Sequence, residues 1–291
     1  MAKSAKVLDG KAIANGIIQS IRHEWLKYEA NYTPPTLAII QVGHDAASTV
    51  YINRKIQACR RVGFDNIHLH LPEDTTQATV LEKILALNAD ESITGILLQL
   101  PLPPQCFATD LLEAIEPSKD VDALTPRNMG SLITGNYDLL PYTTGAILTL
   151  LQGYHVDLLG KRVVMVGASA LVGKPTAIAM VHYHATVTIC HSETKKLKEH
   201  VQTADILIVA IGNPGVIQPD WIPNHCIVID VGINRAGNNQ IIGDIPFEKV
   251  IDRCALITPV PGGVGPVTVA HVVKNLFTLF CRKRALEKAL G

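Results

Sequence analysis

Three side chains that could take part in chemistry share one face of a predicted helix. Ser48, Tyr51 and Lys55 are spaced i, i+3 and i+7 in the segment 46–62, whose pattern predicts a helix. Burial would lower the pKa of this lysine from its usual value of about 10.4 towards neutrality, where an amine can transfer protons. The spacing alone favours an exposed face with a solvated lysine, so the interpretation depends on the rest of the chain.

Residues 258–268, with the sequence Thr-Pro-Val-Pro-Gly-Gly-Val-Gly-Pro-Val-Thr, have small side chains and a restricted backbone. Proline fixes φ, and glycine lets another group approach the backbone closely. The segment is therefore suited to be a rigid wall against which a flat ligand can lie. An unusual turn between the strand predicted before it and the helix predicted after it is the alternative.

A glycine-containing loop lies between a predicted strand, residues 162–166, and a helical pattern. It includes Gly167, Ala168, Ser169 and Gly173. The glycines permit a tight turn, and a helix N-terminus offers N–H groups to a pyrophosphate. The spacing departs from G-x-G-x-x-G, so an ordinary strand-to-helix turn stays open. The Tyr-x-x-x-Lys pair of short-chain dehydrogenases follows the glycine loop, whereas the pair at 51–55 precedes it, so we reject that assignment.

The strand predicted after this loop ends at residues 190–192, Cys-His-Ser. NAD enzymes usually place Asp or Glu there to bind the ribose 2′-hydroxyl. Ser192 instead offers a hydrogen-bond donor, and Lys195 and Lys196 add positive charge nearby, so NADP is favoured over NAD. Glu193 argues in the opposite direction.

Predicted strands and helices alternate along the chain, which is typical of parallel α/β architecture. The pattern divides the chain into a first domain, residues 1–140, and a Rossmann-like second domain, residues 141–269. The last helix, about 270–291, is expected to pack back on the first domain. Strands are predicted at 37–42, 67–71, 95–100, 162–166, 186–190, 206–211 and 226–231. Helices are predicted at 10–28, 46–62, 76–87, 148–154 and 267–288.

The composition restricts the class of protein. The 26 basic and 26 acidic residues balance, which gives no electrostatic reason to expect nucleic acid or an anionic membrane as a partner. No apolar run is expected to approach the ~18–20 residues needed to span a bilayer, and the first residues do not resemble a signal peptide. The six cysteines are scattered, which favours a reducing compartment and a cytoplasmic protein. The histidine pairs 68/70 and 182/184 lack a third ligand at suitable spacing, so no metal is predicted.

Five motifs occur together in one order: residues 48–55, 95–103 (Gly-Ile-Leu-Leu-Gln-Leu-Pro-Leu-Pro) and 119–122 (Lys-Asp-Val-Asp), the loop from Gly167, and the segment from Pro261. With these motifs the chain resembles, over nearly its whole length, the bifunctional methylenetetrahydrofolate dehydrogenase/methenyltetrahydrofolate cyclohydrolases. The resemblance implies two α/β domains with a cleft between them, folate on the N-terminal side, NADP on the Rossmann-like side, and a homodimer formed through the second domain. It also implies NADP-dependent oxidation of 5,10-methylenetetrahydrofolate and hydrolysis of the methenyl product to 10-formyltetrahydrofolate.

The resemblance assigns roles to individual residues. It implies that Lys55 is the catalytic lysine, that Gln99 is its hydrogen-bonding neighbour, that Tyr51 stacks on the folate, and that Asp122 holds the amino-pyrimidine edge of the pterin. Without the resemblance, a structural salt bridge stays open for Asp122. The other implied folate-site residues are Leu98, Leu100, Pro261, Gly262, Gly263, Val264 and Gly265. The implied dinucleotide contacts are Gly167, Ala168, Ser169, Gly173, Ser192 and Ile233.

Three residues depart from the family pattern, one at position 123 and two within the segment 141–144. Ala123 stands where the family usually has glycine, and residues 141–144, Pro-Tyr-Thr-Thr, stand where it has Pro-Cys-Thr-Pro. We expect none of these changes to touch a group that takes part in the chemistry, although each raises a question about the local backbone path.

Two other classes of protein stay open. One is a dehydrogenase of another small substrate on a similar two-domain fold, such as a shikimate-type enzyme. The pairing of Lys55 with the Gln99 motif argues against it, because hydride transfer alone requires no protein base. The other class is a non-catalytic folate or nucleotide binder, and the availability of Lys55, Gln99 and Asp122 for chemistry argues against that.

Overall fold

The computed structural model describes residues 6–237 and 240–290. Its internal contacts divide the chain into two compact units. The Lys55 unit comprises Asn15–Tyr142 and the residues from Val269 onward, and the glycine-loop unit comprises the residues up to Ala14 together with Thr143–Thr268. Both units are mixed α/β structures with a parallel sheet, which confirms the predicted fold class.

Residues 6–14 belong to the glycine-loop unit, whereas the predicted boundary at residue 140 assigns them to the first domain. Val7 pairs in parallel with Ile257 of the glycine-loop unit. The backbone N–H of Gly10 also donates to the carbonyl oxygen of Gly262 at 2.9 Å. A short apolar segment can complete a sheet edge far along the chain, and such pairing has no local sequence signal.

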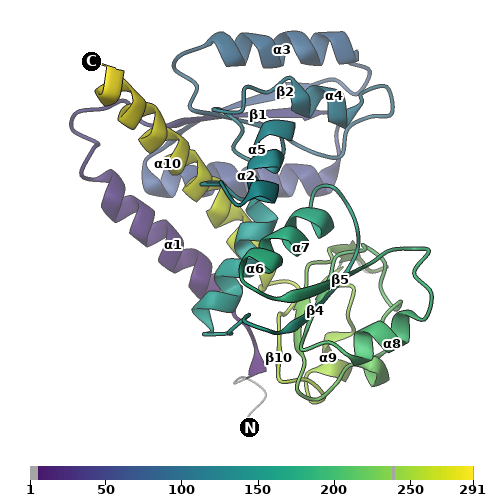
Figure 1. Ribbon diagram of the computed structural model, residues 1–291. Coiled ribbons are helices and arrows are strands. Elements are labelled where there is room, and N and C mark those ends of the chain that lie inside the picture. The colour runs from purple at the N-terminus through teal and green to yellow at the C-terminus, as the bar shows by residue number, and fades with distance from the viewer. Residues whose placement is uncertain (1–5, 238–239, 291) are drawn as a thin grey trace. The chain divides into compact units, whose positions relative to one another are not determined.

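The Lys55 unit contains a three-stranded parallel sheet in the order β2-β1-β3. Its central strand is buried on both faces, which explains its nearly continuous apolar sequence. The strands are β1 (Thr36–Val42), β2 (Asp65–Leu71) and β3 (Gly95–Leu98). Figure 1 labels strands β1 and β2 of this sheet. The helices that lie wholly within this unit are α2 (Ala46–Val62), α3 (Gln77–Ala89), α4 (Ala108–Glu113) and α5 (Pro126–Thr134). Three helices cross between the units: α1 (Gly10–Trp25), α6 (Tyr142–Gly153) and α10 (Val264–Leu290).

Helix α2, which carries Lys55, has well-defined ends. The Asp45 side chain accepts a hydrogen bond from the backbone N–H of Ser48 at 2.6 Å and caps the first turn. Gly63 ends the helix in the left-handed conformation with φ 92°. The predicted bounds of 46–62 are therefore confirmed. Fixed ends on both sides set the rotation of the helix and thus the direction in which Lys55 points.

Among the described residues, helix α10 contains a segment that is long and apolar enough to cross a membrane, whereas no apolar run of that length was predicted. Its segment Val264–Ala285 has a mean hydropathy of 1.4, although charged residues interrupt it. However, 61% of this segment is buried within the protein, as in the core helix of a globular domain. Leu276 lies against strand β3, where a Cβ on Gly95 would come within 2.8 Å of its Cδ1 atom. Asn275 donates to the carbonyl oxygens of Val121 and Leu140.

The glycine-loop unit contains a five-stranded parallel sheet in the order β10-β7-β6-β4-β5. The chain therefore runs outward in one direction from β4 and returns to the other side at β6, as in doubly wound folds. The strands are β4 (Arg162–Val166), β5 (Thr186–Cys190), β6 (Ile206–Val209), β7 (Ile227–Asp230) and β10 (Leu256–Ile257), with a small hairpin of β8 (Asn234–Arg235) and β9 (Ile241–Ile242). Figure 1 labels strands β4, β5 and β10 of the five-stranded sheet. The helices within this unit are α7 (Gly173–His182), α8 (Leu197–Gln202), α9 (Phe247–Val250) and a 3-10 turn, η2 (Pro219–Trp221).

Each unit has a hydrophobic core of its own. In the Lys55 unit, apolar residues of β1 and β3 pack with α3 and α4, and Ile40, Ile84 and Ile96 are fully buried. In the glycine-loop unit, Val164 of β4 and Leu207 of β6 belong to a second cluster. A separate core for each unit explains how the chain keeps rigid platforms beneath both groups of candidate site residues.

Candidate active site

Lys55 and Gln99 are in direct contact inside the Lys55 unit. Lys55 is 3% exposed, and its Nζ donates to the Oε1 atom of Gln99 at 3.0 Å. The exposed, solvated face that the spacing alone favoured is therefore wrong for Lys55. Burial lowers the pKa of Lys55 to about 8, while the negative charge of Asp122 acts in the opposite direction. Near neutral pH this amine can therefore both accept and donate a proton.

The hydrogen bonds of Gln99 fix the orientation of its side chain. Its Nε2 donates to the carbonyl oxygen of Leu100 at 2.7 Å, which leaves Oε1 directed to Lys55. Its backbone N–H donates to the carbonyl oxygen of Ile40, which continues the pairing of β3 with β1. The hydroxyl of Ser48 donates to the same Leu100 carbonyl at 3.3 Å and joins α2 to this strand end. Leu98 is buried in the strand itself.

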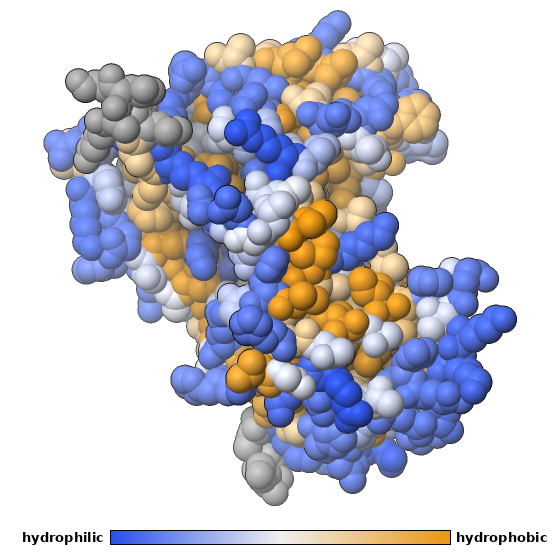
Figure 2. All heavy atoms as spheres, viewed as in Figure 1, coloured by the Kyte–Doolittle hydropathy of each residue, from blue (hydrophilic) through white to orange (hydrophobic). Residues whose placement is uncertain are grey.

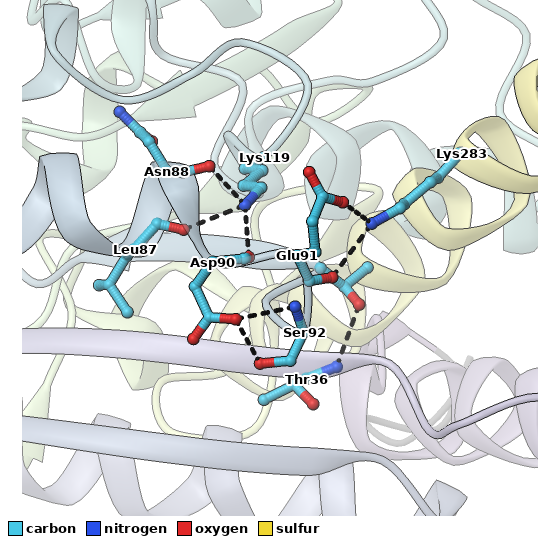
Figure 3. Close-up of polar contacts among 9 residues, drawn as sticks. Thr36, Leu87, Asn88, Asp90, Glu91, Ser92, Lys119 and Lys283 are labelled. Carbon is cyan, nitrogen blue, oxygen red and sulfur yellow. Dashed lines mark hydrogen bonds and ion pairs between the residues drawn. The ribbon is translucent and has the colours of Figure 1, made fainter.

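Lys119 anchors the Lys-Asp-Val-Asp segment to the end of α3. Its ammonium donates to the carbonyl oxygens of Leu87, Asn88 and Asp90 at 3.0, 2.7 and 2.7 Å (Figure 3). Carbonyl groups at a helix C-terminus lack partners within the helix and attract a cation. In the same view Lys283 of α10 pairs with Glu91, so that helix is tied to the loop after α3. Lys119 thus has a structural role that fixes where the segment begins.

The next residues extend the sheet and position Asp122. Ile96 of β3 pairs in parallel with Asp120, although residues 119–122 form no regular strand. The Oδ2 atom of Asp120 accepts hydrogen bonds from the backbone N–H of Thr125 at 2.8 Å and the side chain of Asn128 at 2.9 Å. The two carboxylates of the motif therefore differ in role, because Asp120 holds the turn, whereas Asp122 acts on Lys55 through its charge.

The carboxyl group of Asp122 is buried, with 8% of the residue exposed. Burial raises its pKa to about 8, the charge of Asp120 acts in the same direction, and Lys55 and the backbone N–H of Tyr142 act against it. The charge of each group therefore shifts the pKa of the other, and Asp122 and Lys55 titrate as a pair. A bound ligand that donates hydrogen bonds to Asp122 would favour its charged form.

Tyr142 is a site residue that the sequence analysis missed. We expected the departure at residues 141–144 to touch no chemical group, and this expectation is wrong. The Nζ atom of Lys55 lies 5.0 Å from the centroid of the Tyr142 ring. Tyr142 begins a helix far along the chain from Lys55, so no local pattern indicates the contact. The only available signal was the replacement of a small family residue by an aromatic one next to the domain boundary.

The other two departures have structural explanations. Ala123 adopts φ 57°, the left-handed region that glycine favours, so the backbone follows a path that suits the family's glycine. In the glycine-loop unit, the hydroxyl of Thr144 shares a hydrogen bond of 3.0 Å with that of Thr176, and both residues are fully buried. Thr144 thereby joins α6 to α7 and does not reach the chemistry.

Tyr51 lies on the same helix as Lys55 and is half-buried. The guanidinium carbon of Arg54 lies 5.6 Å from the centroid of its ring. The structure thus brings Tyr51, Lys55, Gln99 and Asp122 together in one unit. The residues proposed from the glycine loop and from the 261–265 segment belong to the other unit.

The glycine loop has the close packing that a phosphate-binding turn requires. Gly167 has φ 121°, and a Cβ there would lie 2.3 Å from the carbonyl oxygen of Ala210. A Cβ on Gly173 would lie 1.9 Å from the carbonyl oxygen of Gly167. The hydroxyl of Ser169 accepts hydrogen bonds from the backbone N–H groups of Val172 and Gly173. Contact with the backbone of Gly167 therefore requires a glycine at position 173, one residue later than in G-x-G-x-x-G.

We expect Gly173→Ala to reduce affinity for the dinucleotide at least about tenfold, because the added methyl group must displace the backbone of Gly167. Forcing atoms into a packed site costs about 1–3 kcal/mol, part of which appears as lost stability. Calorimetric titration with NADP and thermal unfolding measure the two effects. Gly16→Ala is the matched control, since a Cβ at Gly16 meets nothing within 4 Å. Unchanged NADP affinity in Gly173→Ala would contradict the assignment of this loop.

The remaining proposed dinucleotide contacts lie at exposed strand ends. Ser192 is exposed, and the loop around it is held by a hydrogen bond from the backbone N–H of His191 to the hydroxyl of Thr194 at 2.8 Å. Lys196 pairs with Glu199 at 3.1 Å, so its charge is partly neutralised. Ile233 is 45% exposed. Ala168 follows Gly167 and is half-buried.

The segment 261–265 packs more tightly than a bare wall requires. A Cβ on Gly263 would lie 2.6 Å from the carbonyl oxygen of Pro259, and one on Gly10 would lie 1.7 Å from that of Gly263. Gly262 has φ 115°. These glycines are therefore explained by the turn and by the approach of α1. Gly262, Gly263 and Val264 are buried within this unit, Gly265 is half-buried and Pro261 is exposed.

The histidine pair on β2 takes part in hydrogen bonds. A ring nitrogen of His68 lies 3.0 Å from the side-chain oxygen of Gln41, and one of His70 lies 2.8 Å from the carbonyl oxygen of Gly43. The absence of a bound metal remains a prediction.

Comparisons with known proteins agree with this geometry. Residues 8–122 match the family model "Tetrahydrofolate dehydrogenase/cyclohydrolase, catalytic domain", and residues 141–284 match "Tetrahydrofolate dehydrogenase/cyclohydrolase, NAD(P)-binding domain". The chain is 45% identical over 271 residues to "Bifunctional protein FolD 2" of Geobacter sulfurreducens, covering 93% of this chain and 95% of that protein. It is 46% identical over 280 residues to "Bifunctional protein FolD" of Sulfurihydrogenibium sp., covering 95% and 98%.

Solved structures show the same similarity. The bifunctional enzyme FolD of Campylobacter jejuni, a methylenetetrahydrofolate dehydrogenase/cyclohydrolase, superposes with a TM-score of 0.92 at 40% identity, covering 95% of this chain and 99% of that one. The enzyme of Trypanosoma brucei, complexed with NADP and an inhibitor, gives a TM-score of 0.91 at 36% identity, covering 95% and 97%. The chain belongs to the tetrahydrofolate dehydrogenase/cyclohydrolase family, whose members are oxidoreductases and hydrolases of one-carbon folate metabolism, and it contains both the catalytic and the NAD(P)-binding domain of that family.

Proposed function

We propose that this chain oxidises 5,10-methylenetetrahydrofolate to 5,10-methenyltetrahydrofolate with NADP and hydrolyses the product to 10-formyltetrahydrofolate. The observation that carries the proposal is the hydrogen bond between buried Lys55 and Gln99 beside Asp122. A dehydrogenase that only transfers hydride has no need of an amine with a pKa lowered to about 8. Both family domains are present, which supports the two activities in one chain.

The oxidation requires positioning more than acid–base chemistry. When bound, NADP supplies the hydride acceptor, and the amidinium-like product is stabilised by its own two nitrogens. The task of the protein is to hold two rings at reacting distance. Gly167 and Gly173 shape the loop at the N-terminus of α7, where the helix dipole favours a pyrophosphate. The ring of Tyr51, which is half-buried, is proposed to stack on the folate.

The hydrolysis requires proton transfer at Lys55. The neutral amine accepts a proton from the water that attacks the methenyl carbon, so an O–C bond forms without a free hydroxide. The resulting ammonium then donates this proton to N5 as the bond between that carbon and N5 breaks. The remaining hydroxyl proton leaves to solvent, which balances the release of one proton per turnover. Gln99 is neutral, so it holds the amine without adding charge. Its own amide is fixed by the hydrogen bond to the carbonyl oxygen of Leu100.

Asp122 is proposed to hold the pterin. A carboxylate can accept two parallel hydrogen bonds from an amino-pyrimidine edge, as it does from other planar donors. The segment before it is fixed by Lys119 and Asp120, so the carboxyl group is rigidly placed. Leu98 and Leu100, at the end of β3, and residues 261–265 are the remaining proposed folate-site residues.

The two half-reactions test the proposal separately. The purified protein is supplied with 5,10-methylenetetrahydrofolate and NADP, and NADPH formation is followed. In a second assay it is supplied with 5,10-methenyltetrahydrofolate alone, and the loss of methenyl absorbance is followed. Both rates should exceed those of a protein-free control. Hydride transfer without accelerated hydrolysis would show that the protein is a dehydrogenase only, and it would overturn the proposed role of Lys55.

For the cofactor, we expect a higher kcat/KM with NADP than with NAD. Ser192 offers a donor where NAD enzymes usually have a carboxylate, and Lys195 adds positive charge beside it. Lys196 contributes less, because Glu199 neutralises it. Steady-state kinetics with both cofactors at saturating 5,10-methylenetetrahydrofolate measure the ratio, and Ser192→Asp should move it towards NAD. A preference for NAD in the unmodified chain would instead indicate that Glu193 faces the ribose.

A homodimer formed through the NAD(P)-binding domain is part of the proposal. Strand β5 lies at the edge of its sheet, and its residue Ile189 is 40% exposed. Val181 of the neighbouring helix α7 is 54% exposed, and Figure 2 shows hydrophobic residues gathered over this region of the visible surface. An exposed sheet edge with apolar side chains is suited to pairing with a second copy. We also propose a cytoplasmic location without membrane or nucleic-acid partners, which the six free cysteines and the balanced charge support.

A further inference from the structure

Tyr142 contacts the proposed catalytic group from an element that the family roles do not include. It is the first residue of α6, and the Nζ atom of Lys55 lies 5.0 Å from the centroid of its ring. This distance is within the range of cation–π interactions. The backbone N–H of Tyr142 also acts on Asp122, because it favours the charged form of this carboxyl group and so lowers its pKa. One residue therefore acts on both members of the buried titrating pair, with its ring on Lys55 and its backbone on Asp122.

We propose that Tyr142 is a positioning residue whose ring stabilises the protonated form of Lys55 and thereby sets the pH range over which this lysine exchanges protons with the folate substrate. The inference rests on the proposed function and extends it to a residue with no assigned role. The family pattern has cysteine at this position, and cysteine provides no aromatic face. The effect is thus specific to chains with an aromatic residue here.

The ring of Tyr142 affects the protonation of Lys55 separately from burial and from Asp122. Burial lowers the pKa of the lysine, and the charge of Asp122 raises it. A desolvated cation over an aromatic face gains more than an exposed one, so the ring acts in the same direction as Asp122. Lys55 is acted on directly by Gln99 at the end of β3, by Asp122 of the segment 119–122 and by the ring of Tyr142 in α6. Asp120 acts on Asp122, and Tyr51 of α2, which has Arg54 beside it, acts on Tyr142.

The phenol hydroxyl of Tyr142 does not act as a base. The negative charge of Asp122, burial and the neighbouring Tyr51 together raise the pKa of Tyr142 well above its usual value. The hydroxyl therefore stays protonated over the working range, and the ring face is the part that acts on Lys55. This separation can be tested, because phenylalanine keeps the ring and removes only the hydroxyl.

The test measures the protonation of Lys55 directly. Protein labelled with carbon-13 at lysine Cε is titrated by NMR, and the Lys55 signal is identified by its loss in Lys55→Met. We expect Tyr142→Phe to leave the titration midpoint in place. We expect Tyr142→Leu to lower it by about half a unit to one and a half pH units, because loss of the ring disfavours the ammonium. The backbone N–H that lowers the pKa of Asp122 is present in every variant.

The pH profile of methenyl hydrolysis gives the second readout. In Tyr142→Leu its lower limb should move in the same direction as the NMR midpoint, with KM for the folate unchanged, and Tyr142→Phe should behave as the unmodified chain. Tyr142→Met serves as another ring-free variant if the leucine variant does not fold. An unchanged or raised midpoint in the ring-free variants, or an equal shift in Tyr142→Phe, would overturn the proposal. Failure of the proposed function would appear separately, as no hydrolysis by the unmodified chain, while the NMR titration still decides the role of Tyr142.

Discussion

Lys55→Met is expected to reduce methenyl hydrolysis by at least about 10²-fold, because general acid–base catalysis typically contributes 10²–10⁴-fold. Methionine has a similar length and fills the same buried space without a proton-transfer group. The dehydrogenase rate should fall much less, since hydride transfer needs no base. Initial rates of methenyl loss and of NADPH formation, measured on the same preparation, give both values.

The control for this variant is Lys283→Met, which removes a lysine that pairs with Glu91 outside the proposed site. It should leave both rates unchanged. Thermal unfolding and folate affinity show whether Lys55→Met keeps its fold. Hydrolysis at the unmodified rate in a folded Lys55→Met variant would sink the assignment of Lys55. An equal fall of both activities would instead indicate that the lysine positions the folate.

Asp122→Ala should weaken folate binding about 10- to 100-fold while leaving NADP affinity within about twofold. Hydrogen bonds to charged groups contribute about 1.5–3 kcal/mol, and each 1.4 kcal/mol is a factor of ten in affinity. The carboxyl group is buried, so in the alanine variant water does not fully replace its hydrogen bonds to the folate. Calorimetric titration with a folate analogue and, separately, with NADP measures both affinities.

Asp122→Asn is the companion variant for this experiment. It keeps the size of the side chain and one acceptor oxygen but loses the charge, so its folate affinity should fall between those of the alanine variant and the unmodified chain. Asp120→Asn changes the neighbouring carboxylate, which holds Thr125 and Asn128. This variant should lower the free energy of unfolding more than it lowers folate affinity. Equal losses of folate and NADP affinity in Asp122→Ala would point to a structural salt bridge in place of a pterin contact.

Regular elements could be predicted where local signals agree. Helix α2 was predicted at its observed bounds because Asp45 caps its first turn and Gly63 ends it. Strands β4 and β5 were likewise predicted at Arg162–Val166 and Thr186–Cys190, where apolar runs meet turn residues. The start of α6 was placed six residues late, because Thr143 and Thr144 weaken the helical pattern and Thr144 is held by a hydrogen bond to Thr176, far along the chain.

The proposed site was only partly predictable. The proximity of Lys55 to Gln99 followed from the family resemblance, since helix spacing alone favoured an exposed lysine. The contact of Lys55 with Tyr142 could not be predicted, because it depends on the path of the chain from Asp122 to the start of α6. The division of labour between Asp120 and Asp122 was also hidden, since both are carboxylates in one short motif and only their hydrogen-bond partners distinguish them.

The most direct test of the account is the product balance of a single reaction. The unmodified protein is incubated with 5,10-methylenetetrahydrofolate and NADP, the reaction is quenched at intervals, and NADPH, methenyl and 10-formyl products are quantified together. The account predicts that 10-formyltetrahydrofolate accumulates nearly in step with NADPH, with little methenyl intermediate. Accumulation of the methenyl compound, with formyl product appearing no faster than in a protein-free control, would contradict the claim that one chain carries both activities.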